Sequence, residues 1–220
     1  MGLSDVPHNP NWPTTADHTS PAEPYDPTVS AADELARQLR AYQSLGVTAA
    51  LGWSEQPLPT PPENVVLHED HIPFLLVLDP APSNALVPAM RRGSTSGVSV
   101  IDDQELAGYS TVDQRAPYLL VDVDTGSEFC NQTPEHALTV VQQRGRVGLT
   151  IAEGLALVTV RPDMLRPNKC FSLMASRAGN QRVPAIWISQ RRPKLGWCWD
   201  RNPHTWLGAA SAGGRVDSTR

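Results

Sequence analysis

The sequence predicts an α+β fold: a mainly antiparallel sheet with N-terminal and central helices and a strand-rich C-terminal part. Three observations carry this prediction. Helix-capping residues open amphipathic or apolar segments in the N-terminal and central parts, and residues 72–78 and 118–124 are apolar-rich segments of strand length. After Cys170, short strand-like segments are separated by turns rich in Arg, Gly, Asn and Pro. Strands and helices that fall in separate stretches of chain are typical of an α+β protein.

The chain of 220 residues is long enough for one domain, which we expect over residues 30–215. Residues 1–29 contain six of the 21 prolines and few aliphatic side chains, so they predict a disordered or draped extension. Residues 216–220 predict a flexible tail. Neither a signal peptide nor an apolar run of about 18 residues occurs, and three cysteines do not make a disulfide framework. We therefore expect a cytoplasmic protein that does not bind membranes.

The first elements follow from their end signals. Ser30 caps a helix with acidic residues in its first turn, and Gly46 ends it. Residues 51–62 hold four prolines and predict a loop. Residues 72–78 form an apolar run of strand length, and we expect a short helix over 85–90 and a short strand over 98–100.

The central part predicts a strand over Tyr118–Asp124 and two capped helices. Thr133 and Pro134 begin a helix that runs to about Arg144. Thr150 and Glu153 have the spacing of a capping box and begin a helix that ends near residue 161. The C-terminal strands are expected over residues 171–174, 183–189, 196–199 and 205–209.

Charge is unevenly distributed along the chain, whose formal net charge is −5. Residues 1–90 carry two basic and eleven acidic side chains, whereas residues 161–220 carry eleven basic and three acidic ones. The basic C-terminal part could receive an anionic ligand or pair with the acidic N-terminal half. The net acidity of the whole chain argues against nucleic acid as a partner.

Four tryptophans fall within twenty residues of the C-terminal part: Trp187, Trp197, Trp199 and Trp206. Tryptophans are more often core than ligand-binding residues, but several of them beside polar groups suit the walls of a small-molecule pocket. The polar candidates for the same substrate-binding pocket are Ser172, Ser176, Arg177, Asn180, Arg182 and Lys194. Of these, Arg177 or Arg182 would anchor an anion, because a guanidinium is suited to carboxylate or phosphate. Surface ion pairing is the alternative interpretation of the arginines.

The catalytic candidates are His204, Cys198 and Cys170. Histidine titrates near neutral pH, and cations close in sequence favour a thiolate. The alternatives are a solvated turn histidine and packed thiols. Tight pairs of metal ligands are absent, so no metal site is expected. Asp122 and Asp124 share one face of their strand and could form a dyad or a solvent-facing pair.

Several blocks form a recognisable pattern: residues 118–124, 149–159, 168–173, 182–189 and the signature Leu195-Gly-Trp-Cys-Trp199 followed by Asn202-Pro-His-Thr-Trp-Leu-Gly208. These blocks resemble an actinobacterial family of proteins that carry a domain of unknown function. The resemblance covers roughly residues 32–215 and implies no established activity. The chain departs from the family pattern at Asn180, where an acidic residue is usual, and at Ala212, where a cysteine is usual. These departures suggest a copy recruited to a new task, for example in specialised metabolism.

The residues together predict a small-molecule enzyme without an organic cofactor, such as a natural-product tailoring enzyme that catalyses cyclisation, hydrolysis or elimination. Motifs of nucleotide-binding proteins, serine hydrolases and zinc proteases do not occur. Two alternatives remain open: a non-catalytic ligand-binding or regulatory module, and an interaction protein that uses its basic C-terminal face. The oligomeric state is not predicted.

Overall fold

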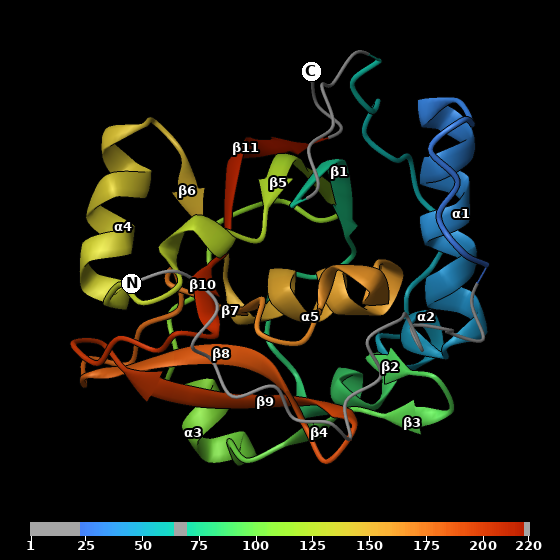
Figure 1. Ribbon diagram of the computed structural model, residues 1–220. Helices are drawn as coiled ribbons and strands as arrows, with labels where there is room; N and C mark the ends of the chain where they lie inside the picture. The colour runs from blue at the N-terminus through green and yellow to red at the C-terminus, as the bar shows by residue number, and fades with distance from the viewer. Residues whose placement is uncertain (1–22, 64–69, 218–220) are drawn as a thin grey trace.

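Two sheets enclose a central helix (Figure 1). The structure is a computed structural model that describes residues 23–63 and 70–217. The first sheet has the order β1-β5-β11-β6, with all pairs antiparallel. Its strands are β1 (His71–Val77), β5 (Tyr118–Asp124), β6 (Val147–Gly148) and β11 (Ser211–Asp217).

The second sheet has the order β10-β7-β8-β9-β4. Its strands are β4 (Val98–Ser99), β7 (Cys170–Ser172), β8 (Arg182–Ser189), β9 (Arg192–Trp199) and β10 (Leu207–Ala209). The three central strands pair antiparallel, whereas the edge strands β10 and β4 run parallel to β7 and β9. A separate small hairpin consists of β2 (Arg91–Arg92) and β3 (Thr95–Ser96). The fold is therefore α+β with mainly antiparallel pairing, as the sequence predicts.

The helices lie between and around the sheets. The α-helices are α1 (Ala31–Ser44), α2 (Val47–Ala50), α3 (Asp103–Ala107), α4 (Pro134–Gln143) and α5 (Ile151–Val160). Short 3₁₀ turns are η2 (Asn84–Ala89), η3 (Ser127–Phe129) and η4 (Pro162–Met164). In Figure 1, α5 lies between the sheets, α3 lies beyond the second sheet, and α1 and α4 flank the molecule on opposite sides.

Helix α5 is the centre of the core, and all ten of its residues are buried. A helix that is apolar on all sides must be enclosed, because no face of it gains from water. Gly154 lets this helix approach the second sheet closely: a Cβ at this position would lie 2.4 Å from a side-chain carbon of Leu173.

A buried ion pair ties α5 to the first sheet. Glu153 is fully buried and completes the predicted capping box by accepting a hydrogen bond from the Thr150 backbone N–H. Its carboxylate also accepts hydrogen bonds from the Tyr118 hydroxyl on β5 and from the Arg215 guanidinium on β11. A buried carboxylate is tolerated only when such partners replace water.

The two capped central helices and the strand β5 confirm the predictions made for them. The predicted C-terminal tail needs correction, since Val216 and Asp217 complete β11 opposite Leu119 and Tyr118. Elements that the sequence does not predict are α3, β6, β11 and the hairpin of β2 and β3. Helix α3 and strands β2, β3 and β6 are too short to leave a clear sequence pattern. Strand β11 begins Ser-Ala-Gly-Gly, which lacks the residues that favour strands.

The described part of the N-terminal extension lies against α1 and the end of α5. The Glu23 backbone carbonyl accepts a hydrogen bond from Arg37, and the Tyr25 ring lies 3.8 Å from the Arg161 guanidinium. These residues are therefore draped over the domain, and residues 1–22 lie outside the described residues.

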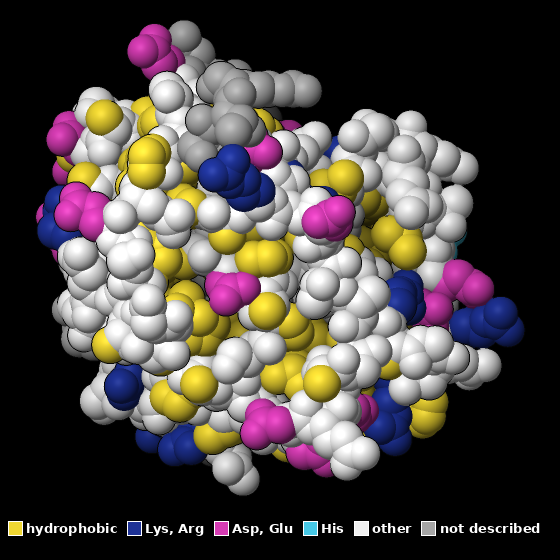
Figure 2. All heavy atoms as spheres, turned by 180° about the vertical axis from the view of Figure 1, so that it is seen from behind, with side chains coloured by type: hydrophobic (Ala, Val, Ile, Leu, Met, Phe, Trp, Pro, Cys, Tyr) yellow, Lys and Arg dark blue, Asp and Glu magenta, His cyan; other side chains and the backbone are white. Residues whose placement is uncertain are grey.

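The rear face of the molecule shows apolar side chains near its middle, with most Lys and Arg side chains at its margins (Figure 2). Within the described residues, every helix is too short or too polar to cross a membrane.

Candidate functional site

The four C-terminal tryptophans lie on two different faces of the second sheet. Leu173 lies against α5, and Phe171, two residues before it, lies on the same face. Phe171 is opposite Ile186 on β8, and Ile186 is opposite Leu195 on β9, so these side chains also face α5. Because side chains alternate along a strand, Trp197 shares this helix-facing side, whereas Trp187 points to the outer side, away from α5. The predicted single pocket with all four tryptophans as walls is therefore not formed by this sheet.

The outer side of the sheet carries a row of four ring or cationic side chains, which we call the aromatic row: Lys194, Trp187, Trp206 and His204. Lys194 lies opposite Trp187 in the β8–β9 pairing, with its Nζ 5.7 Å from the ring centroid. The Trp187 and Trp206 centroids are 6.2 Å apart, and the His204 ring follows at 5.2 Å. All four side chains are partly exposed, so the row is accessible at the surface.

Gly196 allows the Trp187 ring to lie across strand β9. A Cβ at Gly196 would lie 2.3 Å from a ring carbon of Trp187, so any other residue would displace the indole. The glycine of the Leu-Gly-Trp part of the C-terminal signature is thus required by the close approach of the Trp187 ring. It shapes the floor under the aromatic row.

Trp197 and Trp199 form a separate group. Their ring centroids are 5.1 Å apart with the planes at 69°, an edge-to-face contact, and the Arg182 guanidinium lies 4.0 Å from the Trp197 ring. Trp199 is 49% exposed. These two tryptophans lie on the opposite side of the sheet from the aromatic row.

The two cysteine candidates lie far apart in the second sheet. Extending the β7–β8 pairing places Cys170 beside Trp187, whereas Cys198 lies opposite Val183 on the other neighbour of β8. Two strand spacings and an offset of four residues separate them by roughly 16 Å. Burial raises the pKa of each thiol to about 12, which opposes formation of the thiolate that a nucleophile requires. Cys130 is half-buried, and burial raises its pKa as well.

His204 lies in the turn before β10, at the end of the aromatic row. Its backbone carbonyl accepts hydrogen bonds from the N–H groups of Asn131 and Leu207, which fixes the turn. Partial burial lowers the pKa of its imidazole, so the neutral form dominates at neutral pH. The ring is therefore available as a base or as a hydrogen-bonding group beside Trp206.

The remaining predicted binding residues have partners within the protein. Arg177 pairs with Asp200 at 3.1 Å, and Arg182 pairs with Glu105 at 2.7 Å. The Asn180 side chain accepts a hydrogen bond from the Arg182 N–H. Ser172 donates to the Gly208 carbonyl and Ser176 accepts from the Ile151 N–H, and both serines are buried. These contacts support the fold, so a role for these residues in binding stays a prediction.

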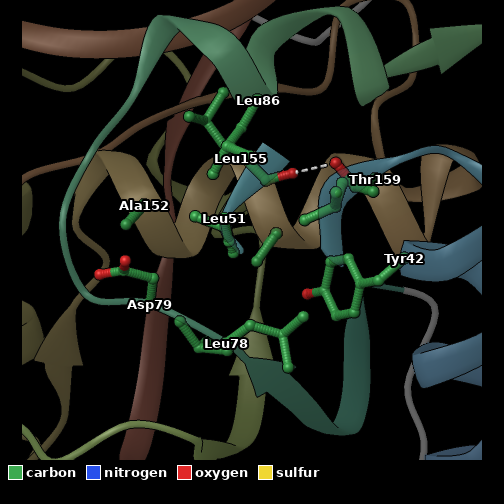
Figure 3. A pocket seen from close by; sticks show the side chains of 11 residues that line it. Tyr42, Leu51, Leu78, Asp79, Leu86, Ala152, Leu155 and Thr159 are labelled. Atoms are coloured by element: carbon green, nitrogen blue, oxygen red, sulfur yellow. Dashed lines mark hydrogen bonds between the residues drawn. The ribbon is translucent and has the colours of Figure 1, made fainter. Parts of the chain in front are cut away.

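Two cavities in the described part of the chain lie away from these candidates. One of about 20 Å³ is lined by Tyr42, Leu51, Leu155 and other residues of α2, β1, η2 and α5 (Figure 3). Its Thr159 hydroxyl already donates to the Leu155 carbonyl, and the space suffices for about one water. The other, of about 130 Å³, lies between the N-terminal extension and β1. Neither is lined by the C-terminal tryptophans.

The paired carboxylates Asp122 and Asp124 hold His71 between them. Its Nδ1 lies 3.1 Å from Asp122 and its Nε2 lies 3.0 Å from Asp124, so both ring nitrogens are occupied. Asp122 has a backbone φ of +49°, and Arg146 contacts both its carboxylate and its carbonyl. Partial burial raises the pKa of Asp122, but hydrogen bonds from His71 and Arg146 outweigh this effect and lower it below the usual value. The cluster braces β1 and β5.

The sequence pattern of the paired aspartates does not indicate that His71 lies between them. His71 meets the two aspartates because it lies directly opposite Asp124 in the β1–β5 register. Register between distant strands cannot be read from one sequence. Among the described residues, no cluster of three or more His, Cys, Asp and Glu side chains is arranged to hold a metal ion.

Comparison with known proteins identifies one family. A model described as a family of unknown function (DUF5701) matches residues 39–218. No curated protein and no solved structure matches the chain.

Proposed function

We propose that this chain, which belongs to the DUF5701 family, binds a small molecule on the aromatic row of its second sheet. The observation that supports the proposal is the unbroken contact from Lys194 through Trp187 and Trp206 to His204 on an accessible surface. The two indoles present flat apolar surfaces. Lys194 at one end of the row carries a positive charge, and His204 at the other end can accept a proton.

The side chains of the row suit a ligand with a planar ring. Stacking of a ring on an aromatic side chain contributes about 1–3 kcal/mol, as alanine substitutions at such contacts show for nucleobases. Lys194 at one end favours an anionic substituent, in keeping with the basic balance of the C-terminal part. The ligand class proposed is therefore a planar, anionic small molecule.

The proposal is tested by binding of planar probes to single tryptophan variants. The probes are adenosine, phenol and benzoate, and affinity is measured by calorimetry. We expect Trp187→Leu and Trp206→Leu each to weaken binding of the probe that binds the parent best by about tenfold or more. Trp199→Leu is the matched control, because Trp199 is exposed but lies on the other side of the sheet.

An equal loss of affinity in Trp199→Leu and Trp187→Leu would contradict the proposal. So would a parent protein that binds none of the probes at millimolar concentration.

Catalysis by His204 is the second candidate function. Its lowered pKa and its place at the end of the row favour a general base acting on a bound ligand. In this version Cys170 and Cys198 are groups of the protein interior, since burial opposes their ionisation. Mass spectrometry of a ligand incubated with the parent and with His204→Gln tests it. Equal conversion by both proteins, or no conversion by either, would remove this candidate.

We propose further that the chain acts in the cytoplasm of an actinobacterium, in specialised metabolism. The support is the family resemblance together with the two departures from its pattern. Ala212 is fully buried in β11 and Asn180 binds only its own turn, so both departures lie outside the aromatic row.

A further inference from the structure

Five cationic side chains at one end of the β8–β9 hairpin have no anionic partner within the described residues. We call them the arginine corner: Arg91, Arg92, Arg191, Arg192 and Lys194. Elsewhere in residues 23–63 and 70–217, every Lys and Arg except Arg115 forms an ion pair. Acidic side chains thus neutralise most of the basic C-terminal part but not this corner.

The fold brings two segments about 100 residues apart together at this corner. Strand β4 runs parallel to β9, with Val98 opposite Lys194. The hairpin of β2 and β3 comes directly before β4 and lies against β9. The Gly97 N–H donates to the Met90 carbonyl at 2.7 Å and closes this hairpin. Residues 91–92 and 191–194 therefore occupy one end of the second sheet.

The corner contains a buried cation that lacks an acceptor. Arg92 is only 5% exposed, yet its Nε has no hydrogen-bond partner, and the same holds for the buried Nε of Arg91. Burial of a charged group without partners is costly, because the group loses water and gains nothing in return. An anion bound at the exposed part of these guanidinium groups would offset part of this cost, which favours an anion site at the corner.

The corner is continuous with the aromatic row. Arg192 lies opposite Ser189 and Lys194 lies opposite Trp187, so both cations share the outer side of the sheet with the Trp187 ring. Residues two apart on a strand face are about 7 Å apart, which places Arg192 within reach of a substituent on a ring stacked at Trp187. Lys194 belongs to both groups and joins them.

We propose that the arginine corner binds the phosphate of a phosphate monoester whose planar ring stacks on Trp187, as in a mononucleotide. Guanidinium groups donate in pairs to phosphate oxygens, and several of them with a lysine match a doubly charged anion. The ring part of this proposal rests on the proposed function, whereas the phosphate part rests on the corner alone.

Three probes separate the two parts: adenosine tests the row, inorganic phosphate tests the corner, and AMP tests both. Calorimetry at low salt measures each affinity for the parent, for the double variant Arg192→Gln/Lys194→Gln, and for Arg92→Gln. Arg201→Gln is the control, because Arg201 is exposed and pairs with Glu135 away from the corner. Urea unfolding of each variant verifies that it is folded, and Arg192→Gln/Lys194→Gln replaces only partly exposed side chains.

We expect AMP to bind the parent at least about tenfold more tightly than adenosine does, since hydrogen bonds to charged groups contribute most. Arg192→Gln/Lys194→Gln and Arg92→Gln should each remove most of this difference, and the affinity for inorganic phosphate should fall with it. The adenosine affinity should change less than about threefold in Arg92→Gln, and Arg201→Gln should bind all three probes like the parent. Binding of AMP should also weaken as salt rises.

Equal parent affinities for AMP and adenosine would overturn the inference, as would Arg92→Gln and Arg201→Gln variants with the same AMP affinity. A single-stranded oligothymidylate that displaces AMP and binds far more tightly would overturn the small-molecule assignment in favour of a nucleic acid. Phosphate binding that depends on Arg92, without any binding of adenosine, would support the corner and contradict the proposed function.

Discussion

Cys170 and Cys198 lie inside the second sheet, where burial raises the pKa of each thiol to about 12. Each donates a weak hydrogen bond to a backbone carbonyl, Cys170 to Arg166 and Cys198 to Val183. A nucleophilic cysteine needs a lowered pKa and access to solvent, and these two have neither. Their environment is that of packed thiols.

Alkylation of the native protein with iodoacetamide at pH 8 should therefore modify Cys130 first, because it is the most accessible of the three thiols. Cys170 and Cys198 should react only after unfolding in guanidinium. Peptide mass spectrometry identifies the sites, and the unfolded protein serves as the control. Native labelling of Cys198 before Cys130 would show that its environment differs from the one described.

The pH behaviour of His204 follows from its burial. Its pKa is lower in the folded chain than the ordinary value of about 6.5, so the unfolded state binds the proton more strongly. The stability that this group provides is present above pH 6.5 and is lost as the pH falls through the folded pKa. A titration of the His204 ring signal by NMR should show a midpoint below 6.5, and His204→Gln should reduce the loss of stability on acidification. A midpoint above 6.5 would be incompatible with the partial burial of this ring.

Helix α5 depends on a single buried carboxylate that joins three elements. Glu153 receives hydrogen bonds from the first turn of its own helix, from Tyr118 on β5 and from Arg215 on β11. The pKa of the Tyr118 hydroxyl is raised, first by burial and then by this neighbouring carboxylate. Glu153→Gln should cost about 3–5 kcal/mol in the free energy of unfolding, because it leaves the Arg215 charge without its partner.

The matched control is Glu128→Gln, which breaks the exposed pair with Arg144. Its cost should stay below about 1 kcal/mol, since water solvates both groups after the change. Urea unfolding at pH 7 compares the two variants. A similar cost for both would mean that the buried network does not hold α5 between the sheets.

The elements that could be predicted from sequence are those with local signals. Helices α4 and α5 are capped by Thr133 and Thr150, whose side chains accept from the backbone N–H three residues on, and β5 begins with the apolar run 118–121. Strand β11 could not be predicted, because it exists through pairing with β5 and β6 and has few strand-forming residues. Local propensity describes the first kind of element, and tertiary pairing determines the second.

The same distinction applies to the candidate site on the scale of the whole molecule. The sequence indicates the C-terminal tryptophans and the basic balance of that part of the chain. It does not indicate that Trp187 and Trp197 lie on opposite sides of the sheet, which follows from strand register. Nor does it bring the segment of Arg91 and Arg92 near that of Arg192, because this proximity arises from the placement of β2 and β3 beside β9.

The distribution of charge gives the molecule one surface suited to an anion. Acidic side chains pair with most of the described cations, while Arg192 and Lys194 of the arginine corner share the outer side of the second sheet with Trp187. Ligand binding on this side would leave α5 and the first sheet unchanged. The binding surface is therefore expected to be rigid and formed before the ligand arrives.

An NMR titration that follows the indole N–H signals, each assigned by a Trp→Phe variant, tests the proposed binding surface most directly. On addition of AMP, the signals of Trp187 and Trp206 should shift together along a single saturable curve, while those of Trp197 and Trp199 should stay in place. Shifts confined to Trp197 and Trp199, or no shift at any indole at millimolar AMP, would contradict the placement of a planar anionic ligand on the outer side of the second sheet.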